Sequence, residues 1–404
     1  MKILQINAVY GQGSTGAIVR DIDLALQNAG AESYVACSRQ RQKLLPHNCY
    51  VIGNSVDYKI HALYTRLAGK QAYGSTISTL QLLKYMERLQ PDIVHLHNLH
   101  SNYINLNLLL SYLADNNIKT IITLHDCWFF TGKCFHFSLV GCMKWKEQCG
   151  SCPKLKDYVP SWFFDQTSKV YEDKKIKFNA ISNLVVVSPS KWMSDQAEQS
   201  ILKDKLILTI NNGVDISVFY PRNVDKSKFD FMKSKRFIII GIASKWLHEQ
   251  NKNTLDYVAK QLDSDSMLLL IGCNEKQINN LPPSVVGMSF VTDRDKLAEI
   301  YSLGDVFVNV SWEDTFPTVN IESICCGTPV VTYNTGGSPE VIDVNTGYTV
   351  PQGDYFELWR KISEVKKKGK EYYVHRCAKT GHMKFNKNDR YEEYIDLYNR
   401  IFEK

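Results

Sequence analysis

Two acidic side chains stand eight positions apart in the stretch SWEDTFPTVNIESICCGTPVV, residues 311–331, and they are the first candidates for chemistry. Asp314 precedes a Phe-Pro pair, and Glu322 falls on the helix that we expect after this pair. A carboxylate inside a helix that otherwise has a buried pattern is costly unless it binds a partner. The pattern therefore predicts that Glu322 holds a ligand hydroxyl.

A glycine-rich segment, YGQGSTGA at residues 10–17, follows a strand expected at 2–8. Its spacing, Gly11-x-Gly13-x-x-Gly16, lets backbone N–H groups approach an anion at the start of the next helix. The same spacing matches the dinucleotide-binding fingerprint, and it also suits a simple strand-to-helix turn. A contact with a phosphate or a sugar is the interpretation that we favour.

Histidines end two of the expected strands. His125 and Asp126 close the strand at 119–125, where the pair could act on a ligand or simply be a packed polar pair. His95 and His97 alternate with apolar residues, so they share one face of a strand, and packing is the more common role for such residues.

Five of the 11 cysteines lie between His125 and Pro153. Cys127 is expected to pack as a small apolar residue. The other four, Cys134, Cys142, Cys149 and Cys152, could close a tetrahedral structural zinc site, form disulfides or remain free thiols. We expect the loop to have too little apolar content to fold without a metal, which favours zinc.

Strand and helix patterns alternate in two series, which predicts two α/β domains with parallel, doubly wound sheets. The expected strands are 2–8, 32–37, 92–97, 119–125, 183–188 and 205–210, then 236–244, 267–272, 305–311 and 329–334. The expected helices are 17–30, 79–91 and 106–117, then 253–262, 294–303, 318–326 and 389–402. A polar linker at 211–235 separates the series. Because ligands bind at the carboxyl ends of such strands, the cleft between the domains is the expected site.

The bulk composition excludes several classes of protein. The 404 residues carry a net charge of +6, which is too weak a basic bias for a nucleic-acid reader. No run of about 18 apolar residues exists, and the N-terminus reaches its glycine loop too soon for a signal peptide, so we expect a cytoplasmic protein. The mixed apolar and basic segment at 60–76 could touch a membrane surface, or be an ordinary surface helix and loop.

Several segments together resemble a known family over essentially the whole chain. They are the glycine loop, PDIVHLHN, TLHD, VVVSPSKWM, INNGVDISVFYP, IIIGIASKWLHEQNKNTL and the two acids with seven residues between them. The chain resembles retaining, nucleotide-sugar-dependent glycosyltransferases of family 4, which have the GT-B fold. It is most similar to bacterial enzymes that build colanic acid, capsule or lipopolysaccharide, because it shares HD.W..TG.C and CG.CP.

The resemblance implies a role for each matching residue. Glu322 would bind the ribose of the nucleotide, Asp314 or Glu313 would lie at the donor sugar, and Asp314 departs from the usual Glu. Lys252 would neutralise the diphosphate. The usual arginine upstream is missing, and Lys245 is the expected substitute. The remaining implied donor contacts are His125 and Gly16 in the first domain and the backbone of Phe316, Thr318 and Val319 in the second.

The resemblance also implies an architecture and an activity. We expect a first domain over 1–215, a nucleotide-sugar domain over 216–384 and a C-terminal helix over 385–404 that packs back on the first domain. The expected reaction moves a sugar from a UDP- or GDP-sugar to a saccharide acceptor without a catalytic metal. The acceptor is expected to be lipid-linked, with the protein at the inner face of the plasma membrane. A sugar-nucleotide epimerase or an inactive partner protein of the same fold are the alternatives.

Overall fold

The computed structural model describes residues 1–38, 45–225 and 237–403, and the chain divides into two compact units. Unit 1 comprises Met1–Asn211 and Arg390–Lys404, and unit 2 comprises Asn212–Asp389. The boundaries inferred from the sequence, after 215 and 384, stand a few residues from these. Most of the second half of the expected linker, from residue 226 onward, lies outside the described residues.

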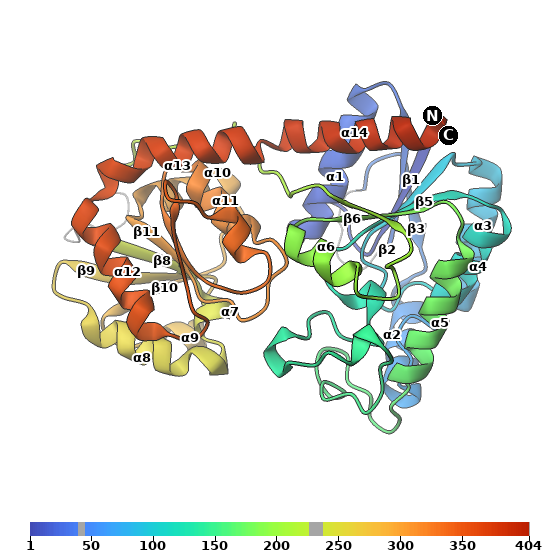
Figure 1. The fold of residues 1–404 in the computed structure, drawn as a ribbon, viewed down its shortest axis with the longest axis horizontal. Helices are drawn as coiled ribbons and strands as arrows, with labels where there is room; N and C mark the ends of the chain where they lie inside the picture. The colour runs from blue at the N-terminus through green and yellow to red at the C-terminus, as the bar shows by residue number, and fades with distance from the viewer. Residues whose placement is uncertain (39–44, 226–236, 404) are drawn as a thin grey trace. The chain divides into compact units, whose positions relative to one another are not determined.

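Unit 1 is built on a parallel sheet of seven strands in the order β3-β2-β1-β4-β5-β6-β7 (Figure 1). The strands are β1 (Lys2–Asn7), β2 (Glu32–Ser38), β3 (Cys49–Ile52), β4 (Ile93–Leu96), β5 (Lys119–Thr123), β6 (Leu184–Ser188) and β7 (Leu206–Thr209). The helices are α1 (Gly13–Asn28), α2 (Ser55–Ala68), α3 (Thr76–Leu89), α4 (Leu106–Asp115), α5 (Thr167–Ala180) and α6 (Lys191–Ala197). The strands β1, β4, β5 and β6 are buried along almost their whole length, as parallel strands covered by helices on both faces must be.

Unit 2 repeats this design with six parallel strands in the order β10-β9-β8-β11-β12-β13. The strands are β8 (Phe237–Ile242), β9 (Ser266–Ile271), β10 (Val285–Met288), β11 (Val306–Asn309), β12 (Val330–Tyr333) and β13 (Gly347–Val350). The helices are α7 (Ala243–Trp246), α8 (Lys252–Gln261), α9 (Glu275–Ile278), α10 (Arg294–Leu303), α11 (Thr318–Cys325), α12 (Tyr355–Lys368) and α13 (Lys370–Phe385).

Each sheet has a point at which the strand order reverses direction. In unit 1 the first strand, β1, pairs with both β2 and β4, and in unit 2 the first strand, β8, pairs with both β9 and β11. Loops that leave neighbouring strands on opposite sides create a crevice there, at the carboxyl ends of the strands. The sequence places the glycine loop after β1, and Asp314 follows β11, so the candidate residues belong to these reversal points.

The last helix, α14 (Lys387–Glu403), packs its C-terminal part on unit 1. Tyr391, Tyr394 and Tyr398 are buried in one apolar cluster with strand residues such as Ile3. The expected aromatic face is therefore correct except at its end. Phe402 is 43% exposed, whereas its neighbour Ile401 packs against the cluster.

The sequence patterns missed elements in both units. The edge strands β3, β10 and β13 are short and only partly buried, so their hydrophobic alternation is weak. The helices α5, α6, α12 and α13 were also not predicted. Among the described residues no helix is both long enough and apolar enough to cross a membrane.

Candidate functional site

The reversal point of unit 2 brings a lysine next to an acid. Lys245 lies on α7, directly after β8, and Asp314 lies in the loop after β11. Lys245 Nζ stands 3.9 Å from Asp314 Oδ2, and both side chains are partly exposed, at 39% and 20%. The expected substitute cation and the expected sugar-site acid therefore lie together at the carboxyl edge of one sheet.

A buried asparagine holds these two segments in register. Asn251 is fully buried, and its Nδ2 donates to the carbonyl oxygens of Lys245 at 2.9 Å and Val310 at 2.8 Å. Its Oδ1 accepts from the indole N–H of Trp312 at 2.8 Å. The next residue, Lys252, begins α8 and is exposed. One side chain thus fixes the segment that carries both candidate phosphate-binding lysines against the acidic loop.

The acidic loop is also fixed from its other side by the glycine pair that follows β12. Thr335 Oγ1 donates to the carbonyl oxygen of Trp312 at 2.8 Å. Gly336 has φ +52°, and a Cβ atom there would stand 1.7 Å from the carbonyl oxygen of Asp314. Only glycine allows this approach. Glu313 is half-buried, and its carbonyl oxygen accepts from Ser311 Oγ at 2.9 Å.

Helix α11 begins within this loop. Phe316 is buried, and its carbonyl oxygen accepts from Asn212 Nδ2 at 3.2 Å. Thr318 and Val319 form the first turn, after Pro317. The first N–H groups of an α-helix have no partner within the helix, and the helix dipole makes this end electropositive. The loop thus places backbone donors beside Asp314, as a phosphate or sugar site requires.

Glu322 occupies the second turn of α11. Its Oε2 accepts from the hydroxyl of Tyr301 at 3.3 Å. Burial raises the pKa of Glu322 to about 7, although nearby Arg294 and the Tyr301 hydrogen bond oppose the rise. A carboxylate held this way gains from any further hydroxyl that donates to it, because each such bond stabilises the charged form.

The reversal point of unit 1 carries the glycine loop. Gly11 N donates to the carbonyl oxygen of Gly16 at 2.7 Å, which closes the turn between β1 and α1. A Cβ atom on Gly16 would stand 3.1 Å from Cγ2 of Val9 and 3.2 Å from the Gly11 nitrogen. The loop is therefore compact because Gly16 has no side chain, as the expectation of a close backbone approach requires.

His125 stands at the carboxyl end of β5 and contacts His97, which follows β4. The distance from His97 Nδ1 to His125 Nε2 is 2.9 Å. Burial is the main cause that lowers the pKa of His125, to about 4, so the ring is neutral at pH 7. Its neighbour Asp126 accepts from His100 Nε2 at 3.0 Å, a partnership that the sequence did not indicate.

His95 has a structural role. Its two ring nitrogens lie 2.6 Å from the hydroxyl of Tyr398 and 2.8 Å from Oγ1 of Thr123. Thr123 Oγ1 in turn lies 3.2 Å from the hydroxyl of Tyr394. His95 therefore ties the C-terminal helix to the sheet of unit 1, and it belongs to packing rather than to the candidate site.

The four candidate zinc ligands line one small cavity in unit 1. The thiols of Cys134 and Cys152 hydrogen-bond to each other, which lowers the pKa of Cys152 to about 7 and raises that of Cys134. The sulfur of Cys149 accepts from the backbone of Gly132 at 3.2 Å. Within the described ranges, no three His, Cys, Asp or Glu side chains are grouped so that they could hold a metal ion.

The expectation that this loop lacks apolar content is wrong. Trp128, Phe129, Phe130, Phe137 and Trp145 are all buried and belong to the main core cluster of unit 1. Cys127 is fully buried in the same cluster, which confirms its expected packing role. The aromatic residues are irregularly spaced, so the sequence showed no periodic pattern, and in the structure they anchor the loop in the core of unit 1.

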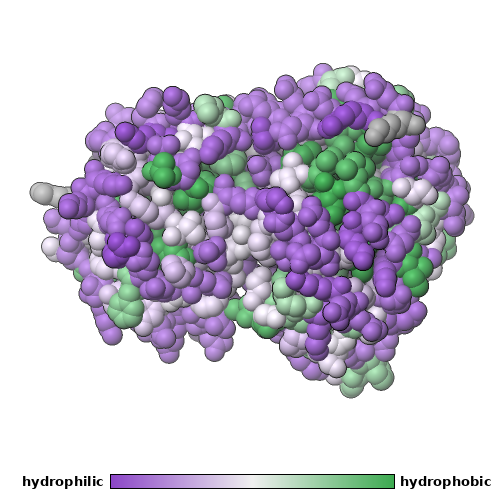
Figure 2. Space-filling model, viewed as in Figure 1, coloured by the Kyte–Doolittle hydropathy of each residue, from purple (hydrophilic) through white to green (hydrophobic). Residues whose placement is uncertain are grey.

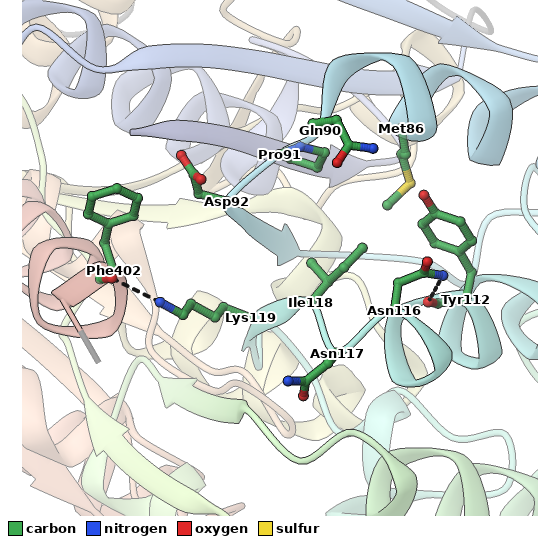
Figure 3. A pocket seen from close by; sticks show the side chains of 10 residues that line it. All are labelled: Met86, Gln90, Pro91, Asp92, Tyr112, Asn116, Asn117, Ile118, Lys119 and Phe402. Atoms are coloured by element: carbon green, nitrogen blue, oxygen red, sulfur yellow. Dashed lines mark hydrogen bonds between the residues drawn. The ribbon is translucent and has the colours of Figure 1, made fainter.

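A cavity of about 290 Å³ opens at the amino ends of the unit 1 strands, opposite the carboxyl edge that carries the candidate residues. Asp92 and Lys119 line it at the amino ends of β4 and β5 (Figure 3). Lys119 Nζ donates to the carbonyl oxygen of Phe402 at 2.9 Å. This cavity contains none of the candidate residues, because they follow the carboxyl ends of their strands.

Two family models match the chain. The model described as Glycosyltransferase Family 4 matches residues 16–218, and the one described as Glycosyl transferases group 1 matches residues 235–367. The chain belongs to glycosyltransferase family 4. It is therefore a glycosyltransferase, and its two parallel-sheet units are those of the GT-B fold.

Two curated relatives of this glycosyltransferase come from bacteria. The chain is 25% identical over 376 residues to the putative colanic acid biosynthesis glycosyl transferase WcaC of Escherichia coli, with 89% of each chain covered. It is 24% identical over 216 residues to the N,N'-diacetylbacillosaminyl-diphospho-undecaprenol alpha-1,3-N-acetylgalactosaminyltransferase of Campylobacter jejuni, covering 50% of this chain and 56% of that one.

Solved structures share the fold of this glycosyltransferase over nearly the whole chain. Sucrose-phosphate synthase from Thermosynechococcus elongatus superposes with a TM-score of 0.69 at 16% identity, covering 99% of both chains. HepE of Anabaena in complex with UDP superposes with a TM-score of 0.66 at 15% identity, covering 99% of this chain and 100% of that one. At these identities the likeness concerns the fold alone.

Proposed function

We propose that this glycosyltransferase moves a sugar from a UDP- or GDP-sugar to a saccharide acceptor, with retention of the anomeric configuration, in the synthesis of a bacterial surface polysaccharide. The observation that carries the donor assignment is the grouping of Lys245, Asp314 and the start of α11 at one reversal point. The relative in colanic acid synthesis supports the class of product, and the UDP complex of a protein with the same fold supports the class of donor.

In this proposal the residues of unit 2 hold the nucleotide and its diphosphate. Glu322 accepts from the ribose hydroxyls, because its partly buried carboxylate can accept from more donors than Tyr301 alone. Lys245 and Lys252 neutralise the diphosphate, and the N–H groups of Thr318 and Val319 bind a phosphate or sugar oxygen. Asp314, with Glu313 beside it, binds hydroxyls of the transferred sugar.

Unit 1 contributes Gly16 and His125 to the same reaction. The compact glycine turn lets backbone N–H groups reach the leaving phosphate. Neutral His125 forms a hydrogen bond with a sugar hydroxyl.

The proposed reaction proceeds on one face of the sugar ring. The acceptor oxygen bonds to the anomeric carbon as the bond from that carbon to the diphosphate oxygen breaks, and the acceptor proton passes to that departing oxygen. Negative charge therefore grows on the diphosphate, where two lysines and a helix N-terminus stabilise it. This scheme needs no catalytic metal, since ammonium and N–H groups supply the positive potential.

A transfer assay tests the proposal. The purified chain is incubated with UDP- and GDP-sugars and a lipid-linked saccharide fraction, and the anomeric configuration of the product is read by NMR. The proposal expects acceptor-dependent release of nucleoside diphosphate and a product of the donor's configuration. An inverted product refutes the retaining mechanism. Conversion of the sugar nucleotide without acceptor indicates an epimerase, and no turnover with any donor indicates an inactive protein of this fold.

A lipid-linked acceptor fits an apolar surface on unit 1. Helix α2 exposes Val56, Ile60, Leu63 and Leu67 on one face, because their spacing of four, three and four residues repeats with the helix period. A second apolar group, Trp162 to Phe164, adjoins it, since Trp162 N donates to the carbonyl oxygen of Arg66 at 2.8 Å. Figure 2 shows apolar side chains among polar ones over the lower part of this unit.

Cations border this surface, which we call the α2 surface. Lys59 is exposed on α2, and exposed Lys156 donates to the carbonyl oxygen of Trp162 at 2.9 Å. Apolar side chains bordered by lysines are typical of surfaces that insert into an anionic bilayer interface. We therefore propose that the α2 surface binds the membrane that carries the acceptor, so that the enzyme acts at the inner face of the plasma membrane.

Vesicle co-sedimentation tests the α2 surface. We expect wild-type protein to bind vesicles with anionic lipid more than purely zwitterionic ones, and Ile60→Ser with Phe163→Ser to lose most of this binding. Phe290→Ser is the matched control, because Phe290 is 76% exposed but lies in unit 2. Equal binding by the double variant and the wild type would refute the proposal.

The structural zinc also remains a proposal. Cys134 and Cys152 already contact each other, and Cys142 and Cys149 line the same cavity, so side-chain rotation would have to complete the site. Buried Lys133 and Lys174 lie close enough to three of these thiols, Cys134, Cys149 and Cys152, to offset part of the negative charge of a zinc centre with four thiolates. Metal analysis of purified protein decides, since about one equivalent of zinc is expected. Absence of zinc together with reactive thiols or a disulfide would reject the site.

A further inference from the structure

A chain of buried hydrogen bonds runs behind His125 across three neighbouring strands of unit 1. Gln5 on β1 and His97 after β4 are both fully buried. Gln5 Oε1 lies 3.2 Å from His97 Nε2, and His97 Nδ1 lies 2.9 Å from His125 Nε2. The strands β1, β4 and β5 are consecutive in the sheet, so the three side chains follow one another along its carboxyl edge.

The backbone sets the direction of this chain. Gln5 Nε2 lies 3.2 Å from the carbonyl oxygen of Val19, which can only accept a hydrogen bond. The amide nitrogen of Gln5 must therefore face Val19, and its oxygen must face His97. Since that oxygen can only accept, His97 must carry a proton on Nε2.

The proton on His97 in turn fixes the proton on His125. Burial lowers the pKa of His97 well below its ordinary value, so the ring is neutral with a single N–H. With that proton on Nε2, the Nδ1 atom of His97 is an acceptor, and His125 Nε2 must donate to it. The opposite arrangement would leave two buried acceptor atoms facing each other between Gln5 and His97, which is costly.

We propose that Gln5 and His97 are positioning residues that hold the proton of His125 on Nε2, so that its Nδ1 atom can only accept. Any group that contacts Nδ1 must then be a donor. Resting on the proposed function, this makes His125 select a sugar that presents a free hydroxyl at that point, and reject a deoxy or O-substituted sugar there.

Other ionisable groups near His125 shift the balance between its neutral and protonated forms. Asp126 favours the protonated ring, whereas the neighbouring charge of His100 opposes it. His95 and His97 are buried, and burial favours the neutral form of both. His100 and Asp126 pair with each other at 3.0 Å, so part of the charge of Asp126 is already compensated.

Nitrogen-15 NMR of histidine-labelled full-length protein at pH 7 tests the proposal without any assay of activity. His125→Asn assigns the signals of the His125 ring. The proposal expects a proton on Nε2 and none on Nδ1. A proton on Nδ1 of wild-type His125 would overturn it. The wild-type spectrum alone decides this point, even if a core variant fails to fold.

Variants then test whether Gln5 and His97 cause the tautomer. Gln5→Met and His97→Leu remove the acceptors, so we expect a mixture of His125 tautomers and a loss of about tenfold in kcat. His97→Asn keeps an acceptor oxygen near the position of Nδ1. This variant should therefore retain most of the proton on His125 Nε2 and most of the wild-type kcat. Tyr398→Phe is the control, because it alters only the neighbouring His95 network. An unchanged tautomer in both Gln5→Met and His97→Leu would also overturn the proposal.

The His125 tautomer and the rate of sugar transfer together distinguish a failure of the positioning proposal from a failure of the proposed role of His125. If the tautomer follows the proposal but His125→Asn transfers sugar at the wild-type rate, the positioning is right and the proposed role of His125 is wrong. If the tautomer is unaffected while kcat falls in every variant, the residues are merely structural.

Discussion

Lys245 Nζ lies 3.9 Å from Asp314 Oδ2, at the point where the strand order of unit 2 reverses. One residue follows β8 and the other follows β11, so 69 positions of sequence separate them. Both side chains remain partly exposed. Such a pair gains little stability from its own attraction, because water screens it. Its position at the carboxyl edge of the sheet fits the role in ligand recognition that we propose for both residues.

Lys245→Ala should weaken donor binding. The variant loses a cation next to the proposed diphosphate, and we expect about a tenfold rise in the Kd for the nucleoside diphosphate, measured by titration calorimetry. Lys245→Arg should retain most of the affinity, since it keeps the charge. Lys260→Ala, which removes an exposed lysine on α8, is the control. Unaltered affinity in Lys245→Ala would show that this lysine does not replace the missing arginine.

Glu322→Gln should stabilise unit 2 at neutral pH and weaken nucleotide binding. The folded-state pKa of Glu322, about 7, exceeds the ordinary value of 4.5, so the folded state holds an extra proton between these values. The stability of the native protein therefore falls as pH rises from 4.5 to 7, by roughly 3 kcal/mol at most from this group. Glutamine removes that cost.

Thermal unfolding at pH 5 and pH 8 measures this effect. The Tm gain of Glu322→Gln over wild type should be larger at pH 8, while affinity for the nucleotide falls about tenfold. Glu371→Gln, an exposed change on α13, should show neither effect. A variant that is less stable than wild type at pH 8 would contradict the account.

Unit 1 should lose stability as pH falls from about 6.5 to about 4. Burial lowers the pKa of His61 to about 4, so the folded state resists the proton that the unfolded chain accepts. Gly74 N donates to His61 Nε2 at 3.1 Å, and a proton on that nitrogen breaks the bond. The stabilisation that neutral His61 provides is present in full above pH 6.5, the pKa of the group in the unfolded chain. As the pH falls to about 4, loss of this contribution lowers the free energy of unfolding by roughly 3 kcal/mol at most.

Hydrogen exchange followed by peptide mass analysis locates this loss. Amides of unit 1 should exchange faster at pH 5 than expected from the intrinsic pH dependence of exchange. His61→Gln should reduce the change around α2, because its amide oxygen can accept from Gly74 at any pH. Identical acid sensitivity in wild type and variant would remove His61 as the cause.

Gly336→Ala should damage the proposed donor site without unfolding unit 2. The new methyl group would collide with the carbonyl oxygen of Asp314 at 1.7 Å, so the acidic loop must move. We expect nucleotide affinity to fall at least tenfold and the Tm to fall by several degrees. Gly369→Ala is the control, since Gly369 also has positive φ but a Cβ there meets nothing within 4 Å. Equal affinity in the Gly336→Ala and Gly369→Ala proteins would contradict this account of the loop.

The two-unit fold was predictable because its central strands are buried on both faces. Strands such as β6, β8 and β9 are nearly continuous apolar runs, which are easily recognised without knowledge of the neighbouring strands. The edge strand β10 and the helix α5 escaped prediction. Helix α5 buries Val170, Tyr171 and Phe178 but also Lys174, whose charge hides the apolar face.

Candidate site residues could be picked out from the sequence only where their type is unusual for the position. Glu322 stands out as a carboxylate in an apolar helix, and the glycine loop stands out by its spacing. Asn251 and Gln5 act through buried hydrogen bonds to segments far away in the sequence, such as that from Asn251 to Val310. A single sequence gives no sign of such partners, because any polar residue in these places could equally face solvent.

Titration calorimetry of the purified chain with UDP and with GDP, using wild type and Glu322→Ala, tests the central claim most directly. The account predicts that wild type binds at least one of the two nucleotides at a single site, and that Glu322→Ala binds it at least about tenfold more weakly while remaining folded by circular dichroism. Binding of neither nucleotide by the wild type, or equal binding by both proteins, would contradict the donor site described for unit 2.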